Sequence, residues 1–145
     1  MFESILVGTD GSGAAGAAVS RAVAMAAALS ARLQIVSAYE PVPERRLRRR
    51  VQVPSDVQVN MREEVLALLE EARGAAQAAG VRSVETFARL GDAADAILDV
   101  AEEQGSDLIV VGNKGMTGAT RFLLGSVPNK VSHHAPCSVL IVRTG

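Results

Sequence analysis

The sequence predicts a single α/β domain, an open parallel β-sheet with helices on both faces. Short apolar runs alternate with longer segments of helical periodicity along all 145 residues. The runs are apolar at consecutive positions, a pattern typical of strands covered on both faces. The composition, 48% hydrophobic and 21% charged, is that of a globular chain with one core. Because no repeat or linker divides the chain, we expect residues 1–145 to form one domain.

In the first half, residues 5–7 predict a buried strand that ends at the turn sequence of residues 8–11. An alanine-rich helix is expected over 12–30 and a second strand over 33–39. Prolines then interrupt the pattern, and residues 45–50 include five arginines, which we interpret as part of a mobile loop.

Residues 57–79 carry apolar side chains at helical spacing and predict a long helix, which Gly80 ends. A third strand is expected over 81–90. Asp92 then caps a helix that Gly105 terminates.

The last third contains two more predicted strands, at 108–111 and 139–142. Residues 113–124 form a glycine-punctuated loop, and a short helix follows over 125–134. The complete order is therefore five strands alternating with four helices.

The overall charge and cysteine content exclude several classes of protein. A net charge of −1 does not favour a polyanion-binding surface. The single cysteine, Cys137, excludes an intramolecular disulfide and is expected to be a small core residue. The N-terminus resembles no signal peptide, and no apolar run approaches a membrane span. We therefore expect a cytoplasmic protein with neither a membrane nor a nucleic-acid partner.

Two turn sequences follow strands, at residues 8–11 and 112–115, and ligands of open parallel sheets bind outside the carboxyl ends of strands. The second continues as Gly112-x-x-Gly115, nine residues, Gly125-Ser126. Glycines allow close approach of a phosphate, helix-start N–H groups bind its oxygens, and Lys114 adds positive charge. An ordinary glycine-rich loop with a serine cap explains the same residues.

This spacing resembles the ATP-binding signature of the universal stress protein family. The opening residues 5–12 and the closing residues 134–142 are also similar to that family. The resemblance implies sheet order 3-2-1-4-5, which brings Asp10 and Gly112 together beside the first and fourth strands.

The resemblance also implies a role for each site residue. Asp10 would bind ribose with Thr9 beside it, Ala38 would meet adenine through its backbone, and Gly112 would lie near the ribose. The phosphates would be bound by Gly115, Gly125, Ser126 and Val127. Members of this subclass often carry magnesium or manganese with the nucleotide. Pro128 departs from the pattern because it lacks the N–H of a further phosphate donor.

The resulting hypothesis is an ATP-binding regulatory or stress-response protein whose nucleotide state controls a protein partner. The alternatives are a slow ATP hydrolase and a sensor of another adenine nucleotide, such as cyclic AMP. Hydrolysis requires a group that orients water. Asp10 is the obvious carboxylate near the site, and its ribose role would keep it from the γ-phosphate, which favours binding over catalysis.

Three further patterns have simpler interpretations. Gly11 to Gly16 fits a dinucleotide fingerprint with Glu40 following the second strand, but Asp10 would repel a pyrophosphate. The adjacent His133 and His134 point to different sides of a helix, so we expect a solvated pair rather than a metal site. The arginines of 45–50 are interpreted as a solvated loop rather than a nucleic-acid contact.

The fifth strand would lie at a sheet edge in the order 3-2-1-4-5. Residues 139–142 are apolar and carry none of the charges or prolines that normally protect an edge. We therefore expect a homodimer in which two copies of this strand pair across a two-fold axis.

Overall fold

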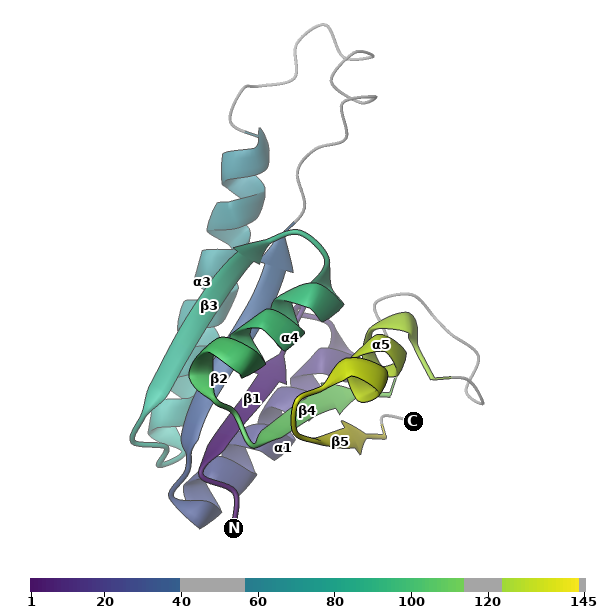
Figure 1. Ribbon diagram of the computed structural model, residues 1–145. Helices are drawn as coiled ribbons and strands as arrows, with labels where there is room; N and C mark the ends of the chain where they lie inside the picture. Colours follow the sequence, from purple (N-terminus) through teal and green to yellow (C-terminus); the bar gives the residue numbers. More distant parts are fainter. Residues whose placement is uncertain (40–56, 114–123, 144–145) are drawn as a thin grey trace, which may run out of the picture.

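The computed structural model describes residues 1–39, 57–113 and 124–143 (Figure 1). Side chains of residues 57–61 are outside this description. The arginine-rich segment also lies outside it, as do Lys114 and Gly115, so the predictions made for them are not addressed by the structure.

The described strands form one five-stranded parallel sheet. They are β1 (Ser4–Gly8), β2 (Arg32–Tyr39), β3 (Val84–Leu90), β4 (Leu108–Gly112) and β5 (Ser138–Val142). Their order is β3-β2-β1-β4-β5, and every pairing is parallel. The predicted fold class and sheet order are therefore confirmed.

Helices cover both faces of this sheet (Figure 1). Helices α1 (Gly13–Leu29) and α3 (Val57–Ala78) pack on one face, and α4 (Ala93–Gln104) and α5 (Ser126–His134) pack on the other. Because strand side chains alternate, Ile5 and Val7 face α1, whereas Leu6 faces α4. The two apolar clusters thus form on opposite sides of the same strands.

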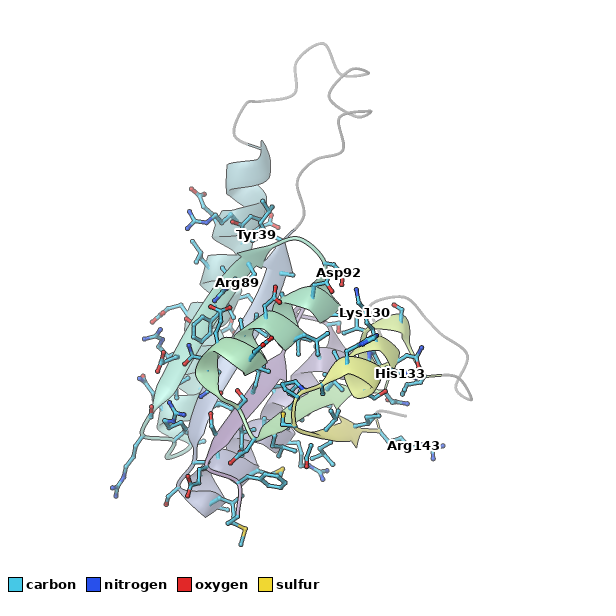
Figure 2. The ribbon with its side chains drawn as sticks, in the orientation of Figure 1. Tyr39, Arg89, Asp92, Lys130, His133 and Arg143 are labelled. Carbon is cyan, nitrogen blue, oxygen red and sulfur yellow. The ribbon has the colours of Figure 1, made fainter. Side chains whose placement is uncertain are left out.

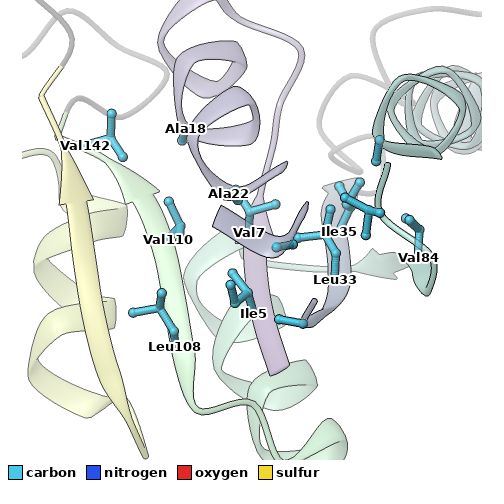
Figure 3. Close-up of a cluster of buried hydrophobic side chains, with 14 of the residues drawn as sticks. Ile5, Val7, Ala18, Ala22, Leu33, Ile35, Val84, Leu108, Val110 and Val142 are labelled. Atoms are coloured by element: carbon cyan, nitrogen blue, oxygen red, sulfur yellow. The ribbon is translucent and has the colours of Figure 1, made fainter. Parts of the chain in front are cut away.

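The α1 face shows how an alanine-rich helix packs (Figure 3). Ala18 and Ala22 have no exposed surface and lie against Val7 and its neighbours in the sheet. Small side chains allow a helix backbone to approach the sheet closely, and branched aliphatic residues of the strands fill the remaining space. This arrangement explains how a chain without tryptophan builds its core.

Local capping agrees with the sequence in most places. The side chain of Asp92 accepts a hydrogen bond from the N–H of Asp95 at 3.0 Å, and Gly105 ends α4 with φ +63°. Ser30, however, ends α1 in the left-handed region with φ 54°. Residues other than glycine rarely adopt this conformation, so the sequence did not predict it.

The third strand begins at Val84, three residues later than the predicted Val81. Val81 is buried, but its N–H donates to the carbonyl of Ala76 at 3.1 Å, inside the last turns of α3. Val81 is therefore part of the turn that ends α3 and not part of the β3 strand. The sequence pattern alone does not separate these two uses of a buried valine.

A buried polar cluster joins the amino ends of three strands. Gln34 on β2 is fully buried, and its Oε1 accepts hydrogen bonds from Ser4 Oγ at 3.1 Å and Ser106 Oγ at 3.0 Å. Nearby, the backbone N–H groups of Glu3 and Ser4 donate to the carboxylate of Asp107. The cluster lies at the opposite end of the sheet from the predicted ligand site.

Candidate nucleotide-binding site

A pocket lies at the carboxyl edge of the sheet, between the ends of β1 and β4. It contains about 560 Å³ of empty space including its open mouth, and it is lined by the ends of three strands and the first turns of three helices. After β1 the chain continues into α1 on one face, whereas the next described element after β4 is α5 on the other face. This is the topological switch point at which parallel α/β proteins bind ligands.

The structure brings most of the predicted residues to this pocket. Five of them contribute to its lining: Thr9, Asp10, Ala38, Gly112 and Val127. Gly125 and Ser126 lie next to Val127 at the start of α5.

Asp10 lies in a tight turn between β1 and α1. Its Oδ1 accepts a hydrogen bond from the N–H of Ser12 at 2.8 Å, and Thr9 Oγ1 accepts one from the N–H of Gly11 at 3.2 Å. Gly11 has φ +82°, a conformation that favours glycine. Within the described residues Oδ2 of Asp10 has no hydrogen-bond partner, so this oxygen is available to accept a bond from a ligand hydroxyl.

Three helices start at the pocket, and each directs its N-terminus towards it. Ser12 caps α1, Asp92 caps α4 and Gly125 occupies the cap position of α5. The first N–H groups of a helix lack intrahelical acceptors and carry partial positive charge, so they attract anions. The side chains of Ser12 and Asp92 already cap α1 and α4, so the start of α5, which has no side-chain cap, is the one open to a negatively charged group.

The first turn of α5 offers fewer donors than an ordinary helix. The N–H of Gly125 donates to the carbonyl of Asn113 at 3.0 Å, which ties the helix start to the end of β4, and Pro128 has no N–H. Within the described part of the chain, the N–H groups of Ser126 and Val127 have no acceptor. These two groups are the α5 donors that a phosphate could use.

The rest of the pocket wall is apolar. Val36, Ala38 and Val111 contribute from the strands, and Ile97 contributes from α4. A methyl group built on Gly8 would lie 2.6 Å from Cδ1 of Ile97, so the present position of the Ile97 side chain on α4 requires a residue without Cβ at position 8. Sequence reasoning placed Gly8 in a turn and did not reveal its contact with α4, which joins residues 89 positions apart.

An ion pair joins two of the helices at the rim. Lys130 Nζ on α5 lies 2.7 Å from Oδ1 of Asp95 and 3.5 Å from Oδ2 of Asp92, both on the first turn of α4 (Figure 2). The hydrogen bond to Asp95 raises the pKa of Lys130 above its ordinary value, so the ammonium is charged at neutral pH. Sequence analysis did not identify this cluster.

The structure argues against the dinucleotide fingerprint. In that motif the third glycine permits close packing of helix and strand. Here a methyl group built on Gly13 or Gly16 would have no atom within 4 Å, so neither glycine is required for a close approach.

His133 and His134 are exposed at the end of α5, with ring centroids 6.4 Å apart. No group of three or more potential metal-binding side chains occurs among residues 1–39, 57–113 and 124–143. Cys137 is half-buried rather than fully in the core, and burial raises the pKa of its thiol above the ordinary value. Within the same ranges, no helix has the length and apolar character needed to cross a bilayer.

Comparison with known proteins shows the family to which this chain belongs. The sequence profile described as the universal stress protein family matches residues 1–143. The chain belongs to the universal stress protein family. The resemblance seen in the glycine pattern and in the two chain ends is therefore confirmed.

Two relatives in this family match along nearly their whole length. The universal stress protein Rv1636 of Mycobacterium tuberculosis is 38% identical over 143 residues, which cover 99% of this chain and 97% of Rv1636. The universal stress protein YxiE of Bacillus subtilis is also 38% identical, over 99% of this chain and 100% of YxiE.

Two solved structures illustrate the shared fold. A crystal structure of a universal stress protein in complex with cAMP is 34% identical, with a TM-score of 0.75 and 99% of both chains covered. The protein MJ0577 superposes with a TM-score of 0.81 over 100% of this chain and 98% of its own, at 23% identity, and supports the fold alone.

Proposed function

We propose that this universal stress protein is a regulatory adenine-nucleotide-binding domain spanning residues 1–145, with ATP as its expected ligand. The observation that carries the proposal is the pocket at the switch point, where Asp10 and the first turn of α5 lie on the same cavity. A hydrogen-bond acceptor, an apolar wall and free helix N–H groups match the three parts of a nucleotide: ribose, base and phosphate.

Each part of the nucleotide has a corresponding group of residues. The base fits between the apolar side chains near Ala38, and Oδ2 of Asp10 accepts a bond from a ribose hydroxyl near Gly112. The phosphates would contact the predicted set Lys114, Gly115, Gly125, Ser126 and Val127. Magnesium or manganese would enter with the phosphates.

The same pocket fits a second ligand, cyclic AMP. A relative at 34% identity has been crystallised in complex with cAMP. Asp10, an acidic residue, is the one charged side chain in the described lining. A cyclic monophosphate carries less charge to neutralise than ATP, so the two nucleotides must be compared directly.

We place the protein among nucleotide-controlled regulators rather than hydrolases. Catalysis of phosphoryl transfer requires a residue that orients the attacking water. Asp10 already accepts the N–H of Ser12 and faces the proposed ribose position. A change in the bound nucleotide would then alter the surface that a downstream protein partner in the cytoplasm recognises.

The decisive experiment is to identify the nucleotide released from freshly purified protein by mass spectrometry. Calorimetric titration with ATP, ADP, AMP and cyclic AMP then ranks their affinities. We expect one adenine nucleotide to co-purify. Gly125→Val should abolish its binding, because the valine side chain would fill the space that the phosphates need at the start of α5. The circular dichroism spectrum should stay unchanged, since the fold is retained.

Three outcomes would redirect the proposal. Unchanged affinity in Gly125→Val would remove the α5 start from the site. Tighter binding of cyclic AMP than of ATP would make the protein a cyclic-nucleotide sensor. ATP hydrolysis at about 10 per second, a typical enzyme rate, would favour the hydrolase if Asp10→Ala abolished it.

We also propose that the protein forms a homodimer through β5. This strand pairs with β4 on one side, and Ile141 is 37% exposed although it lies in a strand of apolar residues. Antiparallel pairing with the same strand of a second copy would satisfy the open ladder and cover these side chains.

Light scattering at micromolar concentration tests the dimer. We expect the wild type to be dimeric and Leu140→Pro to be monomeric, because proline introduces a ring and removes an N–H from the strand. Ile141→Lys keeps the backbone intact and should also weaken the dimer, whereas Leu90→Lys, on the exposed side of β3, should not. A monomeric wild type, or a folded dimer of Leu140→Pro, contradicts this arrangement.

A further inference from the structure

The rim of the pocket contains two carboxylates that would oppose a phosphate. Asp92 caps α4 and Asp95 lies in its first turn, beside Ala93, which lines the pocket. Aspartates are common at a helix start because they stabilise the helix dipole. At this position they also place negative charge next to the surface that the proposed nucleotide must approach.

Lys130 is the cation that contacts both carboxylates in the described structure. Its Nζ lies 2.7 Å from Asp95 and 3.5 Å from Asp92, and in Figure 2 its side chain extends from α5 towards Asp92. Lys130 is one turn beyond Val127 on the same helix, and Val127 itself lines the pocket. The ion pair thus connects the helix that offers phosphate donors with the helix that carries the repelling charges.

Stability alone does not explain the placement of this contact. All three side chains are about half exposed, and ion pairs of that kind contribute little to folding. A second surface pair, Arg89 with Glu103, joins β3 to the other end of α4 at 3.0 Å, and neither residue belongs to the pocket lining. Lys130 differs from Arg89 in that it joins α4 to α5, the helix whose first turn lines the pocket.

We propose that Lys130 is a positioning residue for the nucleotide: it neutralises Asp92 and Asp95 and holds the start of α5 against α4. This role rests on the proposed function, since it needs a phosphate in the pocket. Lys130 does not have to touch the ligand. Its effect is to remove repulsion from the rim, and that effect grows with the negative charge of the ligand.

The test measures affinity for adenosine, AMP, ADP and ATP, first in the wild type and then in Lys130→Met. We expect an unchanged affinity for adenosine and a loss that increases with each phosphate, reaching about threefold to fivefold for ATP, the size expected for an exposed charge contact. The loss should fade in about 1 M salt, where the screening length falls to about 3 Å.

Two further variants separate charge from structure. Glu103→Gln breaks the ion pair with Arg89 from the last turn of α4 and should leave the whole series unchanged. Adding Asp92→Asn and Asp95→Asn to Lys130→Met removes the unpaired carboxylates, and the asparagine at 92 still caps the helix. This triple variant should regain the ATP affinity of the wild type.

The outcomes distinguish this role from the proposed function. If the wild type binds none of the four compounds and no cyclic AMP, the nucleotide function itself is wrong. If it binds them and Lys130→Met binds them equally well, the function stands and the positioning role is wrong. An equal loss for adenosine and ATP also overturns the role, because a purely structural defect would not depend on phosphate charge.

Discussion

Replacing Gly8 with alanine is expected to weaken nucleotide binding by about tenfold to a hundredfold, the usual effect of one misplaced methyl group in a close-fitting pocket. The new Cβ would lie 2.6 Å from Cδ1 of Ile97, so Ile97 must move. Both residues line the pocket, and a shift of Ile97 changes the wall against which the nucleotide rests. Overpacking of this kind also costs about 1–3 kcal/mol of folding free energy.

Two variants control this experiment. Gly16→Ala adds the same methyl group on α1, where nothing lies within 4 Å, and should leave binding unchanged while stabilising the helix. Ile97→Val removes Cδ1, so the double variant Gly8→Ala/Ile97→Val should recover much of the lost affinity. Calorimetry and urea unfolding measure both effects. If Gly8→Ala binds the nucleotide as tightly as the wild type does, the part of the pocket wall formed by Gly8 and Ile97 does not contact the ligand.

Loss of the Asp10 carboxylate is expected to cost about 1–3 kcal/mol of nucleotide binding, the range for a charge-assisted hydrogen bond. Asp10→Ala also removes the bond from the N–H of Ser12, which shapes the turn before α1. Asp10→Asn keeps an oxygen for that bond and removes the charge. Comparison of the two variants therefore separates the turn from the ribose contact.

The ligand and a second acidic residue provide the controls. Asp99→Ala changes the net charge by the same amount as Asp10→Ala, but at an exposed position of α4, and should not affect binding. The deoxyribose form of the bound nucleotide should lose part of the affinity in the wild type but little more in Asp10→Ala. Equal binding of ribose and deoxyribose forms, with no effect of either Asp10 variant, would remove Asp10 from the site.

Most of the fold could be predicted because its signals are local. Continuous apolar runs marked the strands, and Asp92 and Gly105 marked the ends of α4 through their capping chemistry. The prediction that β3 begins at Val81 was wrong because a buried valine gives the same sequence pattern in the turn after a helix as in a strand. The order of the strands was implied by family resemblance, since alternation of strands and helices does not determine it.

The location of the candidate residues was predictable where it depends on chain position. Thr9 and Asp10 follow β1 and Gly112 ends β4, so all three must lie at the carboxyl edge of the parallel sheet. The contact of Gly8 with Ile97 and the ion pairs of Lys130 depend on how α4 packs against β1 and α5. Such contacts join distant segments, and no local pattern in one sequence encodes them.

The buried Gln34 has a consequence for how the strands find their correct alignment. Its carboxamide meets Ser4 and Ser106 only when β2 pairs with β1 so that Leu6 stands opposite Gln34. An alignment displaced by two residues would keep the alternation of apolar side chains, so hydrophobic burial would discriminate against it weakly. In the native sheet Nε2 of Gln34 has no hydrogen-bond partner within the described residues, and the displaced alignment would leave Oε1 without donors as well, at a cost of about 1–3 kcal/mol. Gln34 therefore acts against misaligned sheets during folding, in a chain whose aliphatic strands could otherwise pair in several ways.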